Sequence, residues 1–336
     1  MLTHKTFHRL SILSVLIALT VVVLGAYVRL TDAGLGCPDW PGCYGHIDVP
    51  RTAAEIETAN QAYPDRPVEV QKAWNEMIHR YLASFLGLII LALAFSAWRR
   101  RADPTHKVAL PLTLVALVIF QGMLGMWTVT LLLKPAIVTG HLLGGMRITA
   151  LLWLLALRHS GMFAPVKMPD RSRGYAWAAA LGLVILSFQI ALGGWTSTNY
   201  AAMACPDFPT CQGQWLPWWD AEQAFTIWHG LGADYEGGVL TNEARVTIQA
   251  VHRLGALITF LYIGALAVLI ALRETGILRG IAVAVLVALT VQVGLGIANI
   301  VMFLPLPVAV AHNGGAALLL LTLITPIHSV IPRRTL

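Results

Sequence analysis

The chain has 336 residues, of which 57% are hydrophobic and only 12% are charged, and its mean hydropathy is +0.69. These values exclude a water-soluble globular protein, in which about a quarter of the residues are charged. The net charge of +6 comes from short basic segments between apolar runs, which set the orientation of membrane proteins, so no nucleic-acid partner is indicated.

Eight apolar runs are long enough to cross a hydrocarbon core of about 30 Å, which takes about 20 helical residues. In chain order they cover residues 10–29, 77–98, 108–133, 136–157, 175–197, 247–272, 280–304 and 306–328. The first run follows Lys5 and Arg9, as a secretory signal would, but it is long for a signal and no small-residue cleavage motif follows it. We therefore expect an all-α integral membrane protein with eight transmembrane helices.

Basic residues gather in alternate connections, namely the loops 99–107 and 158–174, the turn 273–279 and the C-terminal tail. Because cytoplasmic loops carry the excess of Lys and Arg, both termini are predicted to lie in the cytoplasm. The long loops 30–76 and 198–246, which contain all four cysteines, are then predicted to lie outside.

The two halves of the chain repeat one another at an offset of about 170 residues. The segment from Gly25 to Cys43 aligns with the segment from Gly193 to Cys211, and the later motifs follow in the same order. Each half has four spans, an even number, so both halves enter the membrane in the same direction. The sequence predicts two tandem four-helix bundles, residues 1–160 and 161–336, related by a pseudo-two-fold axis along the membrane normal.

Each outward loop contains two cysteines with five residues between them: Cys37 with Cys43, and Cys205 with Cys211. The Pro-Asp-aromatic-Pro insert favours a turn and an oxidising compartment permits disulfides, so a disulfide within each pair is the favoured interpretation. Such a disulfide is either a loop staple or a redox-active pair, and a metal site is the remaining alternative. Covalent heme attachment would need a C-x-x-C-H motif, which is absent.

Four histidines match between the halves, each within about two turns of the outward end of its span: His79, His141, His252 and His312. A single histidine in a helix is usually a hydrogen-bonded packing residue. Two per half at equal depth, on the second and fourth helix of a bundle, can instead ligate an iron porphyrin from both faces. The sequence therefore predicts one tetrapyrrole site in each half.

Three charged residues flank these histidines. Glu76 shares a helix face with His79, whereas the second half has Gln249 at that position. Glu76 is interpreted as a carboxylate that moves protons beside one heme; the alternative is a first-turn acid that favours the helix dipole. Arg80 and Arg253 are candidates for pairing with heme propionates, with snorkelling to lipid headgroups as the alternative.

Other polar residues within the spans have weaker interpretations. Arg147 lies near the middle of the fourth span, with Leu318 as its counterpart, and no partner for it can be named from the sequence. A set of small and amide residues is expected to let helices approach closely rather than to bind anything. These are Gly122, Gly125, Gly294, Gly296, Gln121 and Gln292.

Over nearly its whole length the chain resembles the heme A synthase family. The resemblance rests on the duplicated histidine pairs, the string Glu76-Met-Ile-His79-Arg80 and the loop Leu-Thr-Asp-Ala-Gly-Leu-Gly-Cys37-Pro-Asp-Trp-Pro-Gly-Cys43. Members of that family are eight-span membrane oxidoreductases. They oxidise the methyl substituent of heme O to the formyl group of heme A for cytochrome oxidase assembly, with heme b as cofactor.

Matched by motif, the resemblance implies that His252 and His312 ligate heme b, that His79 and His141 bracket heme O, and that Glu76 is the acid required for turnover. It also implies a bacterial inner (plasma) membrane location. The implied partners are heme O, the heme O synthase that supplies it, and membrane lipid. The electron donor, the oxygen source and the oligomeric state stay open, a homo-oligomer included. The family pattern has one cysteine pair, in the first loop, whereas both halves carry one here.

Two other functions remain open at the level of sequence. A di-heme b-type membrane cytochrome that passes electrons between a quinol and an outside acceptor would use the same four histidines but hold two identical hemes. A transporter built on parallel repeats would use the histidines as a proton relay and would bind no heme.

Overall fold

The computed structural model describes residues 3–102, 107–160, 172–228, 230 and 232–330. These residues contain eight helices long and apolar enough to cross a membrane. They are α1 (His4–Leu30), α3 (Val70–Arg99), α4 (Ala109–Thr130), α5 (Pro135–His159), α6 (Ser172–Thr198), α8 (Asn242–Arg273), α9 (Gly276–Val301) and α10 (Leu306–Val330). Two shorter helices, α2 (Ala53–Ala62) and α7 (Ala221–Ala224), lie in the long loops. The expectation of an all-helical protein with eight membrane spans is confirmed.

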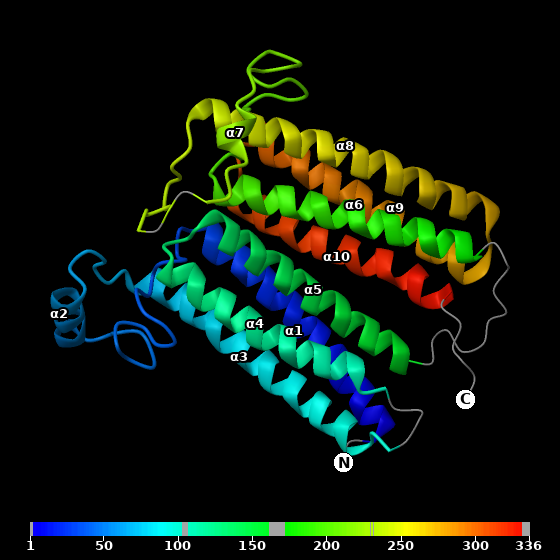
Figure 1. Cartoon of the computed structure of the whole chain (residues 1–336), viewed down its shortest axis with the longest axis horizontal. Helices are drawn as coiled ribbons and strands as arrows, with labels where there is room; N and C mark the ends of the chain where they lie inside the picture. Colours follow the sequence, from blue (N-terminus) through cyan, green and yellow to red (C-terminus); the bar gives the residue numbers. More distant parts are fainter. Residues whose placement is uncertain (1–2, 103–106, 161–171, 229, 231, 331–336) are drawn as a thin grey trace.

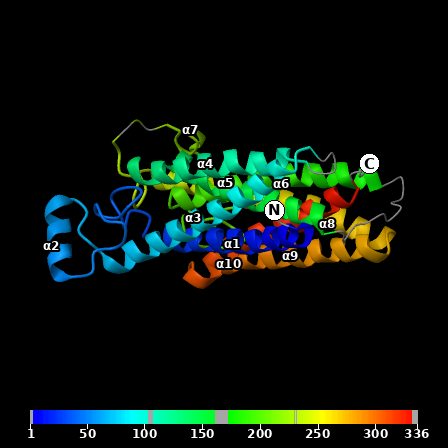
Figure 2. The ribbon, with the colours of Figure 1, turned by 90° about the horizontal axis from the view of Figure 1, so that it is seen from below.

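The spans pack in two sets of four (Figure 1). Helix α1 contacts α3 and α5, and α4 also contacts both; in the second set α6 and α9 each contact α8 and α10. The sets meet where α1 and α5 pack against α10 and where α5 packs against α6. Seen from below, the helices run alongside one another, with α2 at one end (Figure 2). Helix α1 begins, and α10 ends, at the end opposite α2 and α7 (Figure 1).

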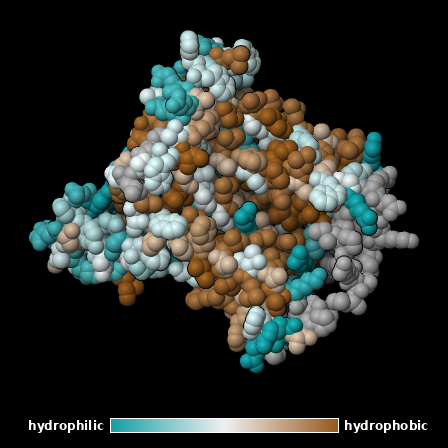
Figure 3. Space-filling model, in the orientation of Figure 1, coloured by the Kyte–Doolittle hydropathy of each residue, from teal (hydrophilic) through white to brown (hydrophobic). Residues whose placement is uncertain are grey.

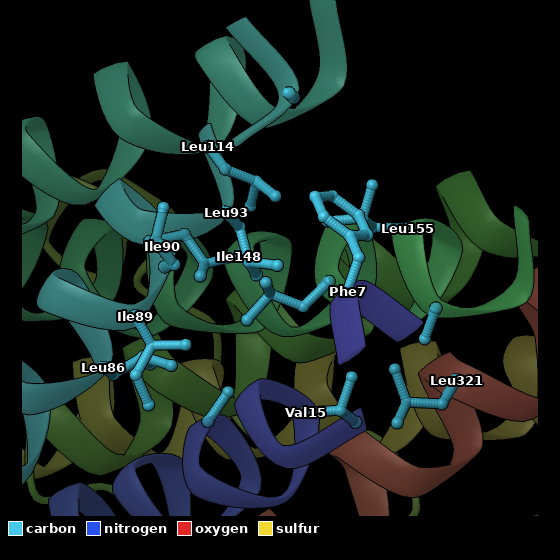
Figure 4. Close-up of a cluster of buried hydrophobic side chains, with 14 residues drawn as sticks. Phe7, Val15, Leu86, Ile89, Ile90, Leu93, Leu114, Ile148, Leu155 and Leu321 are labelled. Atoms are coloured by element: carbon cyan, nitrogen blue, oxygen red, sulfur yellow. The ribbon is translucent and has the colours of Figure 1, made fainter. Parts of the chain in front are cut away.

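Buried aliphatic side chains fill the interior of both sets and join them. One cluster combines residues of α1, α3, α4 and α5, among them Ile90, Leu114 and Leu152, with Leu321 of α10 (Figure 4). A second cluster is centred on α6 and α8–α10 but includes Met146 of α5. The face of the helices seen in Figure 3 is mostly hydrophobic, with most of its hydrophilic side chains towards the edges of the molecule. The helical surface therefore suits contact with lipid, since apolar surface of this extent is not stable in water.

Several helices begin earlier than the apolar runs predicted, among them the two that follow the long loops. Helix α3 starts at Val70 and α8 at Asn242, rather than near 77 and 247. Their first turns are polar and escape a hydropathy criterion, but the hydroxyl of Thr241 caps α8 by accepting a hydrogen bond from the Ala244 N–H. With 32 residues, α8 is about 48 Å long, which exceeds a hydrocarbon core of about 30 Å. The first turns of α8 therefore project beyond the hydrocarbon.

Two helices also end earlier than predicted, α4 at Thr130 and α9 at Val301 rather than near 133 and 304. After α4, the Leu132 N–H donates to the carbonyl of Val129 and the Leu133 N–H to that of Thr128, which is the bond pair of a Schellman motif. The left-handed position of this motif usually holds glycine. Here Leu132 has a φ of 49°, so no glycine marked the end of the helix. The turn after α9 repeats the arrangement with Phe303.

Candidate functional site

The halves of α3 and α5 nearer the disulfide loops bring His79 and His141 together. Their ring centroids are 6.4 Å apart and their planes make an angle of 69°. Two imidazoles that each hold a nitrogen about 2 Å from one metal ion, on opposite sides, have centroids about 6 Å apart. The spacing therefore fits two axial ligands of one iron. In the second set, His252 of α8 and His312 of α10 are the repeat counterparts of these histidines.

The protein's own side chains supply two ligands at each of these positions rather than a full metal cage. Among the described residues there is no group of three or more His, Cys, Asp or Glu side chains that could hold a metal ion. Porphyrin-bound iron already has four ring nitrogens and needs only axial ligands from the protein. The donor set of each half therefore fits a heme and does not fit a structural zinc site, which takes four protein ligands.

Each of the four histidines lies against a glycine of a neighbouring helix. A Cβ at the glycine would come within 3.0–3.3 Å of the ring Cε1 atom, which is closer than ordinary van der Waals contact. The pairs are Gly25 with His79, Gly125 with His141, Gly193 with His252, and Gly296 with His312. Since the arrangement occurs four times, these glycines shape the histidine sites. The sequence had assigned Gly125 and Gly296 only to general helix packing.

Gly296→Ala is expected to lower the heme content of the purified protein, because the added methyl group would displace the His312 ring. Overpacking of this kind costs about 1–3 kcal/mol, or roughly 5- to 100-fold in affinity. Gly294→Ala, on the same helix with open space around its Cβ position, is the matched control and should leave heme content unchanged. Heme absorbance per mole of protein measures both; equal values in the two variants would show that the ring at His312 tolerates the methyl group.

Glutamines accompany three of the four histidines. The Gln121 side-chain nitrogen lies 3.1 Å from Nδ1 of His141 and donates to its backbone carbonyl at 2.7 Å. Gln189 makes both contacts with His252, each at 3.1 Å. The Gln292 side-chain nitrogen lies 3.4 Å from Nε2 of His312. Two of these glutamines were predicted only to assist packing, and Gln189 was not predicted at all.

The side-chain oxygens of Gln121, Gln189 and Gln292 are buried and have no hydrogen-bond partner within the described parts of the chain. An imidazole that ligates iron through Nε2 keeps a proton on Nδ1 and needs an acceptor for it. For Gln121 and Gln189, which contact Nδ1, rotation of the amide would bring such an oxygen to it. His79 has no such glutamine: Val21 stands where α6 has Gln189, and no side chain of the described residues hydrogen-bonds the buried Nδ1 of His79.

Glu76 is 5% exposed and connects α3 to the first disulfide loop. Its Oε2 accepts a hydrogen bond from the backbone N–H of Cys37 at 2.9 Å, and its Oε1 pairs with Arg80 at 2.5 Å. In the second half Gln249 is equally buried, but its Oε1 has no hydrogen-bond partner among the described residues. The Glu76 carboxylate thus accepts a hydrogen bond from the disulfide loop that the Gln249 oxygen does not.

Both cysteine pairs form disulfides, Cys37 with Cys43 and Cys205 with Cys211, as the favoured interpretation predicted. All four cysteines are buried, at 0–4% exposure. Attack by an external thiol would therefore require the loop to open first.

An aspartate folds back inside each disulfide loop. Asp207 accepts hydrogen bonds from the Thr210 hydroxyl and from the backbone N–H groups of Gln212 and Gly213. The bond from Thr210 and those from the two backbone groups lower the pKa of Asp207 to about 2, since they favour the charged form. Asp39 makes the corresponding backbone bonds in the first loop. The two loops therefore share one internal structure.

The repeat-matched arginines hold these loops against their helices. Arg80 donates to the carbonyls of Asp39 at 3.0 Å and Gly42 at 2.5 Å. Arg253 donates to the carbonyls of Thr210 at 2.6 Å and Cys205 at 2.7 Å. The sequence did not predict this role. The Nε of Arg253 is buried with no partner among the described residues, so this guanidinium keeps a donor for an anion; pairing with propionates stays a prediction for both arginines.

The second long loop, between α6 and α8, also reaches over the first helix set. The Tyr235 N–H donates to the carbonyl of Leu132 at 3.2 Å, and the Tyr235 side chain is 2% exposed. The ammonium group of Lys134 donates to the Gly230 carbonyl at 2.9 Å, and Arg66 forms ion pairs with Asp234 and Glu236. This crossing segment, residues 230 and 232–236, contacts the turn between α4 and α5, the helices that carry Gln121 and His141.

Arg147 is exposed on α5, and its counterpart Leu318 is 52% exposed on α10. Nothing in the structure explains this arginine.

Comparison with known proteins gives consistent results. The family model COX15-CtaA, described as a cytochrome oxidase assembly protein, matches residues 8–324. A heme A synthase from Shewanella oneidensis is 47% identical over 316 residues, which cover 93% of this chain and 93% of the relative. Heme A synthases from Rhizorhabdus wittichii and Paracoccus denitrificans are 30% and 31% identical, over 95% and 97% of this chain and 92% and 88% of their own lengths.

Proposed function

Because the chain belongs to the COX15-CtaA family and acts as a heme A synthase, we propose that its first half converts heme O to heme A while its second half holds heme b. The reaction oxidises the methyl substituent of heme O to a formyl group. The observation that carries this division is the one acidic difference between otherwise matched sites: Glu76 beside His79, against Gln249 beside His252.

The two helix sets are proposed to be four-helix bundles, residues 1–160 and 161–336, related by a pseudo-two-fold axis along the membrane normal. In support, exchange of the two sets leaves the pattern of helix contacts unchanged. The proposed orientation places both termini in the cytoplasm and the disulfide loops outside, since basic residues concentrate in the connections at the other end. Of these connections, 103–106, 161–171 and the tail 331–336 lie outside the described residues.

In the second bundle, His252 and His312 are the proposed ligands of heme b. Gln189 supports this assignment, because its side chain lies beside Nδ1 of His252 with a buried oxygen ready to accept the imidazole N–H. Such a partner fixes the orientation of a ligating imidazole and raises its basicity. An axial ligand oriented in this way suits a resident cofactor.

Gln189→Val, which installs the residue found at Val21 in the first half, is expected to weaken heme b binding by about 10- to 100-fold, the usual effect of removing a ligand's hydrogen-bond partner. Heme retention on dilution, measured by absorbance, is the readout. Ser187→Val is the control, because Ser187 is on the same helix and its hydroxyl only bonds the carbonyl of Leu183. If both variants retain heme equally, Gln189 is a packing residue.

In the first bundle, His79 and His141 are proposed to bracket heme O. The bound iron supplies the oxidising chemistry, as in other heme oxidases. The protein orients the substrate between the two rings. Glu76 is proposed to hold or accept a proton beside the substrate. Arg80 and the Cys37 N–H fix the position of this carboxylate.

The absence of a glutamine beside His79 also fits a substrate half, because a substrate must leave. Because Val21 supplies no side-chain acceptor for Nδ1 of His79, this ring is proposed to be the weaker axial ligand of the pair. The proposed partners are heme O, the heme O synthase that supplies it, and membrane lipid.

The hemes themselves test this function. Protein purified from cells with and without a supply of heme O is extracted with acid acetone, and the hemes are identified by mass. We expect heme b in both samples and heme O or heme A only in the first. Two hemes b per chain under both conditions would instead indicate a di-heme cytochrome, and a colourless protein would indicate a transporter.

A further inference from the structure

The second outward loop exposes a hydrophobic segment that the site described above does not use. In residues 215–219, Trp215 is 76% exposed, Leu216 80%, Trp218 83% and Trp219 49%. No charged residue lies between Asp207 and Asp220. A contiguous group of large exposed apolar side chains on a loop marks an interaction surface.

The first outward loop shows that this exposure is not a general property of the repeat. When the loops are aligned on their cysteines, Asp48 and Arg51 occupy the positions of Leu216 and Trp219. Asp48 and Arg51 form an ion pair at 3.0 Å, and both side chains are more than half exposed. The counterpart of Trp215, Ile47, is also exposed, so the region carries charged side chains beside one apolar residue in the first half and only uncharged, mostly aromatic side chains in the second.

The hydrophobic segment lies beside α8 rather than beyond its end. The Asp220 N–H donates to the Thr247 hydroxyl at 2.9 Å, and Arg253 holds the preceding disulfide loop. Thr247 and Arg253 are about 8 Å and 16 Å along α8 from its first residue, at 1.5 Å per residue. In Figure 1 the loop between α6 and α7 projects sideways from α8. Since the apolar part of α8 begins near residue 247, the segment is level with the boundary between headgroups and hydrocarbon.

We propose that residues 215–219 lie in the headgroup region of the outer leaflet, so that the partner of this surface is the lipid bilayer. Tryptophan prefers this region because its ring is apolar while its indole N–H can remain hydrated. The uncharged composition of the segment and its continuity with the lipid-facing surface of α8 favour lipid over a soluble protein. The contact anchors the Cys205–Cys211 loop, and through Arg253 it steadies the helix next to His252. It requires α8 to span the membrane but does not depend on the proposed reaction.

A matched pair of spin labels tests the proposal. Every cysteine of the described chain is in a disulfide, so Leu216→Cys and its counterpart Asp48→Cys each introduce one labelling site. The full chain is reconstituted in phosphatidylcholine vesicles, and label collisions with oxygen and with a water-soluble nickel complex are measured. The label at position 216 is expected to favour oxygen, which concentrates in the bilayer, and the label at position 48 to favour nickel. Equal preference for nickel at both positions would overturn the proposal.

Tryptophan fluorescence gives a second measurement that does not depend on a label. The fluorescence of a variant with Trp215, Trp218 and Trp219 replaced by Phe is subtracted from that of the native protein, and the difference signal comes from these three rings. The vesicles contain lipids with acyl chains brominated near the headgroup, which quench tryptophan emission. The difference signal should lose at least as large a fraction of its intensity as the emission of Trp177, a reference residue that is 78% exposed on span α6. Quenching by aqueous iodide alone would place the segment in water, and protection from both quenchers would mean that protein covers it; either result contradicts the proposal.

Discussion

Glu76→Gln is expected to lower heme A formation by about 10²- to 10⁴-fold, the contribution of a positioned proton-transfer group, while the protein keeps its bound heme. Glutamine has the size of the native side chain, and the second half has Gln249 at the equivalent position without loss of its histidine pair. The amide oxygen can still accept the Cys37 N–H. What disappears is the ionisable oxygen that pairs with Arg80. Mass analysis of extracted hemes should show heme O, or a hydroxylated form of it, in place of heme A.

The control for this variant is Glu69→Gln. Glu69 precedes α3 about two turns before Glu76, is 62% exposed and pairs with Lys72 at 2.9 Å. Exposed pairs of this kind contribute about 0–1 kcal/mol, so heme A production should not change. Normal production by Glu76→Gln as well would remove Glu76 from the reaction. Loss of heme from Glu76→Gln would instead assign the carboxylate a structural role in holding the disulfide loop.

The four histidines could be found from the sequence because they break a strong pattern. Ionisable residues within a span are rare, so His79 and His252 stand out, and the repeat placed them at matching depths. Gln189 could not be found in the same way. An amide within a span commonly serves helix packing, and the repeat gave no support because its counterpart is Val21. The role of Gln189 becomes visible only in the structure, from its two contacts with His252.

The partners of Glu76 and Arg80 were out of reach for a different reason. Glu76 contacts Cys37, which is 39 residues away in the sequence, and Arg80 contacts Gly42, 38 residues away. Neither periodicity nor charge pattern shows that the disulfide loop folds back along α3. The number of spans, by contrast, followed from local hydrophobicity alone, and only their ends were misplaced, where polar turns continued a helix or a residue other than glycine ended it.

His252→Ala and His312→Ala are each expected to remove the low-spin absorption of heme b. Low-spin heme of this type needs two strong axial ligands, and alanine supplies none. His79→Ala and His141→Ala are expected to retain the heme b spectrum while heme A formation stops, because these rings belong to the other half. Absorbance of the purified variants and mass analysis of their hemes measure the two effects separately.

Comparing the His79 and His141 variants with the His252 and His312 variants is more informative than any single variant. A general loss of folding would remove the heme b spectrum in all four variants. If both loops still had intact disulfides in that case, unfolding would be excluded as the cause of the loss. The opposite pattern, with heme b lost only from the His79 and His141 variants, would place the cofactor in the first half. In that case Glu76 would lie beside the resident heme, and its carboxylate would tune a cofactor instead of serving a substrate. The proposed division of the reaction thus depends on which histidine pair keeps its heme.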